Sequence, residues 1–371
     1  MQKINILDSA LRCAQGNASQ TVALMKGSNP HISSKKVETL DATIEIPYFL
    51  FQEEVTDVKV AIKDIVKEIS DKLSSKQKKC TALIIGTALV DENLVDAIES
   101  TVYEYKKEAY SSSKKSIDTF AKEISEELGL NPFTVTVSTA CTSSANALLE
   151  ARNLINSSVF DYAIVVGVEV SSQMMSNGFS SMKLLSTTTQ KPFDVSRDGL
   201  ILGEAIAAVL IGKEESLWTL LGGYSNCNSL NITSVSPTGE EYVQVMERAI
   251  SLSKVNKEQI DVIKAHATST PTNDLSEINA ISKMFDSSVR FTAIKPYIGH
   301  TLGACGILEL ALFISCIDDG FIPKTLHHKN SIIEGYKPLE KDESTQGGIF
   351  MLNYFGFGGN NTSLIIQKEL A

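Results

Sequence analysis

Cys141 combines a reactive side chain with a position where nucleophilic chemistry is common. It lies in the segment STACTSS, where an apolar β-branched run gives way to an alanine- and leucine-rich helical pattern. A thiol at the start of a helix faces unpaired backbone N–H groups and the positive end of the helix dipole, and both favour the thiolate. Taken alone, however, Cys141 is better explained as a small buried side chain, as most free cysteines are.

Two histidines change that balance. His266 follows a predicted strand in KAHATSTPTND, and His300 lies between a strand and a small-residue helix in KPYIGHTLGACG. A single histidine in such a loop is typical of a hydrogen-bonded structural residue. Because open α/β sheets place their sites at the carboxyl ends of strands, we expect both histidines and Cys141 on one rim of the same core. This set is suited to covalent catalysis by a thiol.

Weaker signals surround this set. Glu309 lies inside an apolar helical pattern, and a buried carboxylate needs a partner, for which Lys295 is the candidate. The segment FGFGGNN, residues 355–361, lacks the strand–loop–helix setting of a phosphate loop. We interpret it as a tight turn that brings backbone N–H groups close to a ligand. The pair Met174 and Met175 is more typical of core than of pocket.

The elements that position these residues alternate along the chain. We expect strands at 81–86, 133–139, 161–169, 205–212, 261–267, 289–294, 347–353 and 362–367. We expect helices at 58–73, 115–128, 144–156, 240–252, 274–285 and 304–317. Near-continuous apolar strands separated by helices predict an α/β fold with mixed sheets that are covered on both faces. The last two strands, joined by a glycine-rich turn, are predicted to pair antiparallel.

The chain also contains an internal repeat of secondary-structure elements. A strand, a small-residue loop and an Ala/Leu-rich helix occur in that order at 134–155 and again at 289–317. This similarity suggests an internal duplication whose halves meet near residues 213–222. We predict an N-terminal half at 1–217 that carries the cysteine, and a C-terminal half at 218–371 that carries both histidines. No low-complexity linker separates them, so one compact body is expected.

Composition limits the class of protein. The 371 residues are 43% hydrophobic and 21% charged, which is typical of a globular chain, and the formal net charge of -10 argues against nucleic-acid binding through broad charge complementarity. The first residues lack the pattern of a signal peptide, and the longest uncharged apolar runs are far short of the about 20 residues of a membrane span. The six cysteines, without C-x-x-C pairs, predict free thiols in the cytoplasm and no metal site.

Five ordered blocks resemble the elongating β-ketoacyl-acyl-carrier-protein synthases of the thiolase superfamily. They are VSTACTSSANAL, GFSSMKLLSTTTQKPFDVSRDGLILGEA, EQIDVIKAHATSTPTNDLSE, AIKPYIGHTLGACGILEL and NYFGFGGNNTSLI. The resemblance runs from about Leu128 to the C-terminus and includes all three reactive positions. It implies a duplicated thiolase-like αβαβα fold, a homodimer, and decarboxylative condensation of a malonyl unit with a cysteine-bound acyl chain.

The resemblance also implies roles for individual residues. Cys141 would accept the acyl group, while His266 and His300 would hydrogen-bond the malonyl thioester carbonyl. The N–H groups of Cys141 and Phe357 would form the oxyanion hole, with Phe357 also gating the pocket. Thr268 and Thr270 would hold the pantetheine arm, Lys295 and Glu309 would form a buried supporting pair, and Asp274 would add polar support. No cofactor is implied beyond the phosphopantetheine of acyl carrier protein, which carries the substrates.

The sequence departs from the family pattern in three places. The loop after His266 reads A-T-S-T where the family has G-T-G-T, Ala205 replaces a customary glycine, and the N-terminal third is only loosely similar. The N-terminal third diverges from the family while Cys141, His266 and His300 are all retained. This combination suggests a specialised synthase for a polyene or polyketide-like product rather than the housekeeping fatty acid enzyme.

Two alternatives remain open at this point. The first is a non-condensing partner subunit that shapes chain length in a ketosynthase heterodimer, although such partners typically lose the cysteine that this chain retains. The second is a thiolase-like enzyme acting on coenzyme A esters, which the H-x-T-x-T and K-x-x-x-G-H blocks disfavour. The dimer could form with a second copy or with a paralogue. Carrier docking has a candidate cluster in Lys106, Lys107, Lys114 and Lys115.

Overall fold

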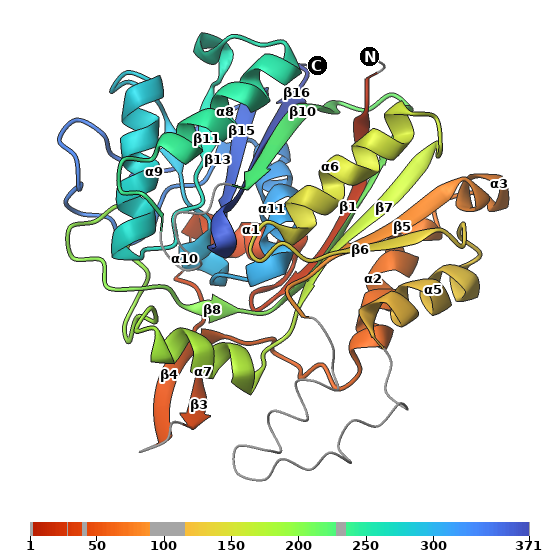
Figure 1. Cartoon of the computed structure of the whole chain (residues 1–371), viewed down its shortest axis with the longest axis horizontal. Helices are drawn as coiled ribbons and strands as arrows, with labels where there is room; N and C mark the ends of the chain where they lie inside the picture. The colour runs from red at the N-terminus through yellow and green to blue at the C-terminus, as the bar shows by residue number, and fades with distance from the viewer. Residues whose placement is uncertain (1–2, 28, 39–42, 90–115, 228–234, 371) are drawn as a thin grey trace.

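A long mixed sheet forms the centre of the molecule. The computed structural model describes residues 3–27, 29–38, 43–89, 116–227 and 235–370. The strands follow each other across the sheet in the order β12-β11-β15-β16-β10-β1-β9-β7-β5-β6 (Figure 1). Their bounds are β1 Asn5–Cys13, β5 Thr81–Gly86, β6 Thr134–Val137, β7 Tyr162–Glu169, β9 Ala205–Gly212, β10 Trp218–Cys227, β11 Val262–Lys264, β12 Phe291–Thr292, β15 Gly348–Phe355 and β16 Asn360–Lys368.

The sheet contains the same five-strand arrangement twice. Across the sheet, the strands of the first half lie in the order β6, β5, β7, β9, β1. Numbered by their place in the chain, this is the order third, second, fourth, fifth, first. The strands of the second half lie in the same order: β12, β11, β15, β16, β10. The strand directions also repeat, since the second strand is parallel to the third and fourth while the fifth is antiparallel to its neighbours. The expected duplication is therefore visible in the topology. The halves join where β1 pairs with β10, and the division at residue 217 stays a prediction.

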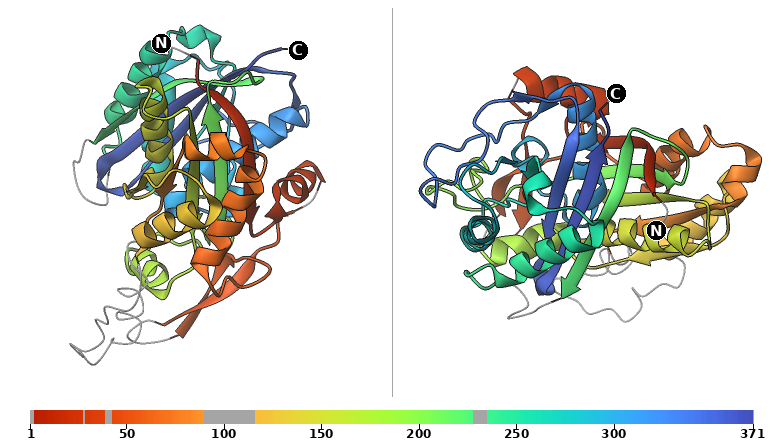
Figure 2. Two further views of the ribbon diagram at one scale, coloured as in Figure 1. Left: turned by 90° about the vertical axis from the view of Figure 1, so that its right-hand side faces the viewer. Right: turned by 90° about the horizontal axis from the view of Figure 1, so that it is seen from above.

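Six helices cover both faces of the sheet in three layers. Helices α2 (Val58–Ser70) and α5 (Ile117–Leu128) pack on the outer face of the first half, and α8 (Glu240–Ser253) and α9 (Pro271–Met284) on that of the second half. Helices α6 (Ser143–Asn156) and α11 (Cys305–Asp318) lie between the halves and contact each other. The perpendicular views show helices on both sides of the strands (Figure 2). This is the predicted αβαβα layering.

Coverage on both faces explains why β5, β7 and β9 are apolar at nearly every position. In β5, Leu83 and Ile85 pack toward α2 and α5, whereas Ala82 and Ile84 pack toward α6 and α11. A strand that alternates its side chains between two buried faces needs apolar residues throughout. The continuous apolar runs of the sequence follow directly from this arrangement.

The starts of α6 and α11 cross in very close contact. A Cβ atom added to Gly306 would lie 2.2 Å from the backbone nitrogen of Ala145, and one added to Gly86 would lie 2.2 Å from Cα of Ser144. Only glycine permits this approach. In addition, Ser144 Oγ accepts a hydrogen bond from the N–H of Ile307 at 3.1 Å. The loops that precede these two helices are therefore held side by side.

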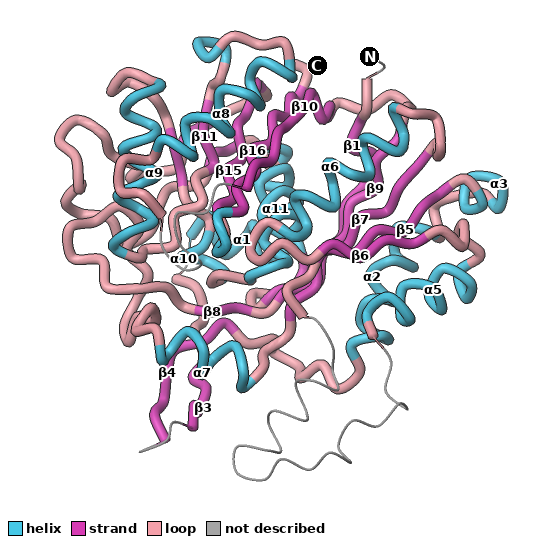
Figure 3. Tube along the Cα trace, viewed as in Figure 1, coloured by secondary structure: helices cyan, strands magenta, loops and turns pink. Residues whose placement is uncertain are grey.

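Smaller elements surround this core (Figure 3). Strands β3, β4 and β8 form a separate sheet, with α7 against β3, and α1 packs on α11. The bounds are α1 Ala18–Gly27, α3 Ser75–Lys79, α7 Gln173–Ser181, α10 Lys295–Ile298, β2 Gly16–Asn17, β3 Ser33–Glu38, β4 Thr43–Phe49, β8 Leu202–Gly203, β13 Phe321–Ile322 and β14 Glu343–Ser344. In the described part of the chain, no helix has the length and apolarity that crossing a bilayer would require.

The predicted elements are all present, β5 and β9 with the predicted bounds and the others with shifted ends, and the last two strands pair antiparallel as expected. Two central strands were not predicted. Strand β1 mixes polar and apolar residues, and its Asn5 is satisfied inside the sheet because Asn5 Oδ1 accepts a hydrogen bond from Thr219 Oγ1 at 2.9 Å. Strand β10 contains Gly222, where a Cβ atom would lie 2.5 Å from Ser253 Oγ. Tertiary contacts therefore determine both strands.

Candidate active site

Cys141 lies in the turn between β6 and α6. The preceding residue, Ala140, has a left-handed φ of 53°, and Thr142 is the N-cap position of α6. Cys141 is 6% exposed, and Cys305 Sγ donates a hydrogen bond to its carbonyl oxygen at 2.9 Å. Backbone N–H groups of Phe357 and of Cys141 itself approach the sulfur. The predicted oxyanion donors are thus both next to the thiol.

His266 lies just beyond β11 in a strained loop. Ala267 has a φ of 51° and Ser269 has a φ of 67°, so the two positions where the sequence departs from G-T-G-T are the left-handed ones. Two buried carboxylates hold this backbone in place. Glu277 accepts hydrogen bonds from the N–H groups of His266 (2.7 Å) and Ala267 (2.8 Å), and Asp274 Oδ1 accepts one from Ser269 at 3.1 Å. The departure from glycine therefore leaves the loop strained, and the two carboxylates anchor it.

His300 lies in the equivalent loop before α11. Its backbone is fixed to the end of β8, since its N–H donates to the Ile201 carbonyl at 2.7 Å and its carbonyl accepts from Gly203 at 3.1 Å. Its Nδ1 accepts a hydrogen bond from the N–H of Leu302 at 3.2 Å. Because Nδ1 is an acceptor, the neutral imidazole must carry its proton on Nε2.

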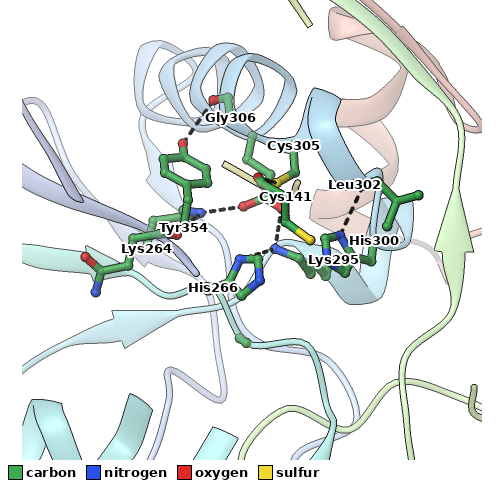
Figure 4. Close-up of polar contacts among 12 residues, drawn as sticks. Cys141, Lys264, His266, Lys295, His300, Leu302, Cys305, Gly306 and Tyr354 are labelled. Carbon is green, nitrogen blue, oxygen red and sulfur yellow. Dashed lines mark hydrogen bonds and ion pairs between the residues drawn. The ribbon is translucent and has the colours of Figure 1, made fainter. Parts of the chain in front are cut away.

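The three predicted reactive residues converge on one cavity. Cys141, His266, His300 and Phe357 all line it, and its empty volume is about 550 Å³, including the solvent at its mouth. The centroids of the two imidazole rings lie 5.2 Å apart and the rings are inclined at 85°. Figure 4 shows the Cys141 sulfur and both imidazoles around the same point, although the residues come from both halves of the chain.

A buried ion pair supports His266. Lys295 Nζ lies 3.2 Å from His266 Nδ1 and 2.6 Å from Glu309 Oε1. An ammonium can only donate, so Nδ1 of His266 accepts and Nε2 carries the proton, as in His300. Nε2 of His266 is buried and has no partner in the part of the chain that the structure describes. Lys295 and Glu309 thus form the predicted pair.

Both histidines are neutral in this environment. Burial lowers the pKa of His266 and of His300 well below 6.5, and the nearby Lys295 charge lowers both further. Burial also works against the charge on Lys295, but Glu309 outweighs it and raises the pKa of that ammonium. The site therefore contains two neutral N–H donors beside a permanent cation.

The Cys141 thiol differs from the sequence-based expectation. Burial raises its pKa to about 11, while the Lys295 charge and the N–H of Phe357 oppose that rise. The backbone groups do favour the thiolate, as expected for a helix start, but desolvation of a fully enclosed sulfur is the larger effect. The resting protein therefore holds a thiol, and the expectation of a thiolate is wrong for this state.

The remaining predicted residues lie at the rim or behind it. Thr268 and Thr270 line the cavity with their hydroxyl oxygens 2.9 Å apart. Phe357 begins the turn between β15 and β16, and its ring stacks on Phe179 of α7 with centroids 5.6 Å apart. Asp274 lies behind the cavity, where it also accepts from the N–H of Phe193 at 2.8 Å. Lys106, Lys107, Lys114 and Lys115 lie outside the described residues.

Three charged residues near the site were not predicted. Lys264 and Glu277 are fully buried beside His266. Glu169, at the end of β7, accepts hydrogen bonds through Oε2 from the N–H groups of Ala88 and Gly303, both at 3.1 Å. The sequence did contain a signal for such residues. Lys264 lies inside the otherwise apolar run DVIKAHA, and Glu169 lies at the end of another apolar strand. A charged group in such a position requires a buried partner.

Comparisons with known proteins agree with this geometry. A family model described as "Beta-ketoacyl synthase, N-terminal domain" matches residues 19–216, and one described as "Beta-ketoacyl synthase, C-terminal domain" matches 218–329. A mitochondrial 3-oxoacyl-[acyl-carrier-protein] synthase of Arabidopsis thaliana is 32% identical over 254 residues, which cover 62% of this chain and 55% of the relative. Across five curated relatives, the matched stretch covers between 54% and 77% of the relative's length.

Solved structures show the same fold over the whole chain. A β-ketoacyl synthase from Burkholderia phymatum superposes with a TM-score of 0.87 at 21% identity and covers 100% of both chains. A ketosynthase in complex with its chain length factor, from Xenorhabdus doucetiae, has a TM-score of 0.85 at 24% identity and covers 99% of this chain and 98% of that one. The predicted thiolase-like fold is confirmed.

The strained backbone at Ala267 predicts a stabilising substitution. Ala267→Gly should raise the free energy of unfolding by roughly 0.5–1 kcal/mol, because glycine adopts a left-handed φ without the Cβ penalty. Ala265→Gly is the matched control: that residue is as buried but has no left-handed φ, so it should destabilise. Urea denaturation of both variants measures this, and a loss of stability in Ala267→Gly would contradict the argument.

Glu169 predicts a pH effect on stability. Burial raises its pKa to about 8, so the folded protein keeps a proton that the unfolded chain releases near pH 4.5. The resulting stabilisation is complete below that pH and is lost as pH rises toward 8, by roughly 3–5 kcal/mol. Glu169→Gln keeps an acceptor for the two N–H groups and does not titrate. Its unfolding free energy should therefore fall less than that of wild type between pH 6 and 8.5; identical slopes would contradict the assignment.

Proposed function

The chain belongs to the β-ketoacyl synthase family, and from that premise we propose that it condenses a malonyl unit with an acyl chain held on Cys141. The observation that carries the proposal is the convergence of one thiol and two Nε2–H imidazoles on the same cavity. A thiol alone suits many reactions. A thiol beside two neutral donors suits the particular need to form and discharge a thioester enolate.

The first step loads the enzyme. The Cys141 sulfur attacks the carbonyl carbon of an acyl thioester, a new C–S bond forms, and the bond to the carrier thiol breaks. The Cys141 proton leaves with the departing thiol, so no net charge accumulates. A thiol whose pKa is raised to about 11 by burial becomes reactive only when the substrate carbonyl and the backbone N–H groups share its developing charge.

The second step loses carbon dioxide. The bond between the malonyl carboxylate and the α-carbon breaks, and its electron pair moves into the thioester to give an enolate. The Nε2–H groups of His266 and His300 hydrogen-bond the enolate oxygen, and one such donor is typically worth about 3–4 kcal/mol. Because decarboxylation replaces deprotonation, the site needs no general base, which fits two imidazoles that are neutral donors.

The third step joins the chains. The α-carbon of the enolate attacks the acyl carbonyl on Cys141, and the resulting oxyanion lies between the N–H groups of Cys141 and Phe357. Collapse of this intermediate releases the lengthened β-ketoacyl thioester and the Cys141 thiolate. That thiolate then takes up one proton, so the cycle consumes a proton and restores the resting thiol.

We further propose that both substrates arrive on the phosphopantetheine arm of acyl carrier protein and that no other cofactor takes part. The paired hydroxyls of Thr268 and Thr270 suit the amides of such an arm. The product would enter fatty acid or polyene and polyketide-like synthesis. We place the reaction in a reducing compartment, the cytoplasm, since Cys141 must remain a free thiol, and all six cysteines are free.

The assembly we propose is a dimer formed through β6, with a second copy or a paralogous chain. Among the strands that the structure describes, β6 is the last of the sheet, and an edge strand offers unpaired backbone groups. Apolar side chains extend this edge, with Phe133 40% exposed and Val159 56% exposed. The Xenorhabdus ketosynthase is solved in complex with a chain length factor, and retention of Cys141 favours the condensing role for this chain over the partner role.

Substitutions at the reactive residues should separate the partial reactions. Cys141→Ala should lower condensation by at least about 10³-fold. His300→Ala should lower malonyl decarboxylation by about 10²–10³-fold and leave acylation of Cys141 less affected. Intact-mass spectrometry follows acylation, and release of carbon dioxide follows decarboxylation. Cys80→Ala, at the end of α3, is the control and should behave as wild type; condensation by Cys141→Ala at the wild-type rate would end the proposal.

The assembly has its own test. Phe133→Asp combined with Val159→Asp places charges along the β6 edge and should shift the protein from dimer to monomer at micromolar concentration, measured by sedimentation velocity. Leu252→Asp, on α8 and 46% exposed, is the matched control and should leave the dimer intact. If the edge variant sedimented like wild type, the dimer would not form through β6.

A further inference from the structure

Lys264 is a second lysine at the site, and its ammonium is fully enclosed. It lies at the end of β11, two residues before His266, and has no exposed surface. Its Nζ donates to Glu309 Oε2 and to the carbonyl oxygen of Asn353 at 2.9 Å. The same atom lies 3.8 Å from the centroid of the Tyr354 ring. Two acceptors and one aromatic face together satisfy this buried cation.

Glu309 lies between two ammonium groups. Oε2 accepts from Lys264 while Oε1 accepts from Lys295 at 2.6 Å, and Lys295 in turn contacts Nδ1 of His266 at 3.2 Å (Figure 4). The four groups therefore form a continuous chain that ends at the imidazole. One carboxylate shared by two ammonium groups leaves an excess positive charge within this chain of four groups, and such a charge is costly to bury.

The geometry shows what Lys264 changes. Without Lys264, both oxygens of Glu309 would be open to Lys295, and the carboxylate could turn and draw that ammonium away from the imidazole. With Oε2 occupied by Lys264, only Oε1 is left for Lys295. The remaining N–H groups of Lys295 then stay available to His266 Nδ1.

We propose that Lys264 is a positioning residue for the malonyl step: it holds Glu309 so that Lys295 stays on Nδ1 of His266 and the Nε2 proton faces the substrate. This inference rests on the proposed condensation. It goes beyond that proposal because it assigns a role to a residue that touches neither substrate nor imidazole. Its action is specific to one of the two partial reactions, since acylation of Cys141 does not use the enolate donors.

Burial supports a division of roles between the two lysines. Desolvation lowers the pKa of Lys264, whereas the pKa of Lys295 is raised because Glu309 outweighs its burial. The lysine next to the imidazole is thus the one that stays firmly charged. A permanent cation at Nδ1 keeps that nitrogen an acceptor.

The test uses the full-length protein and four variants. Lys264→Met keeps the volume of the side chain but removes the contact with Glu309. It should slow malonyl decarboxylation by about 10- to 100-fold, less than the full loss of an enolate donor, while acylation of Cys141 changes less than about twofold. Lys264→Gln retains a donor for Glu309 and should recover most of the lost rate. His266→Ala and the double variant Lys264→Met/His266→Ala complete a cycle in which Lys264→Met causes no further loss.

Each outcome decides one question. Wild-type decarboxylation in Lys264→Met, or an equal loss in acylation and decarboxylation, would overturn the positioning role. A further loss in the His266→Ala background would show that Lys264 acts elsewhere and would also overturn it. Absence of malonyl decarboxylation in the wild type would instead reject the proposed function. Should Lys264→Met fail to fold, the ¹⁵N spectrum of His266 in wild type decides: an Nε2–H tautomer supports the inference and an Nδ1–H tautomer refutes it.

Discussion

The close crossing of α6 and α11 is the constraint on which the site depends. Gly306 lets the start of α11 approach the start of α6 to a distance that no other residue allows, and Gly86 lets α6 lie equally close to the end of β5. Cys141 lies in the loop before α6 and His300 in the loop before α11. The hydrogen bond from Cys305 Sγ to the Cys141 carbonyl then connects the loops directly. A nucleophile from one half and a donor from the other therefore share a cavity because two helices touch.

Much of this arrangement could be predicted from the sequence. Apolar runs separated by helical patterns identify strands that are covered on both faces, and these runs located β5, β7 and β9 to within a residue or two. Because sites form at the carboxyl ends of strands, the positions of Cys141, His266 and His300 at predicted strand ends were enough to place them on one rim. The recurring strand–loop–helix unit also indicated the duplication.

Other features depend on contacts that local patterns do not record. Strand β1 lies in the middle of the sheet with polar residues, because its neighbours supply their hydrogen-bond partners. The acidity of Cys141 depends on how completely the folded chain excludes water, so a helix start alone gave the wrong direction. Lys264 needed Glu309 and Tyr354 as partners, and these come from distant segments. The left-handed φ at Ala267 likewise depends on a contact that local patterns do not record, the hydrogen bond from its N–H to Glu277.

The stacked rings of Phe179 and Phe357 matter because both halves of the chain belong to one continuous sheet. Because hydrogen-bonded strands run from one half into the other through β1 and β10, the halves cannot open like a hinge to admit a substrate. Phe179 and Phe357 both line the cavity that contains Cys141, so rotation of these two side chains changes access to the thiol without moving the sheet. Side-chain rotation is faster by orders of magnitude than hinge motion of whole domains. Rotation of these rings therefore leaves the mutual distances of Cys141, His266 and His300 unchanged.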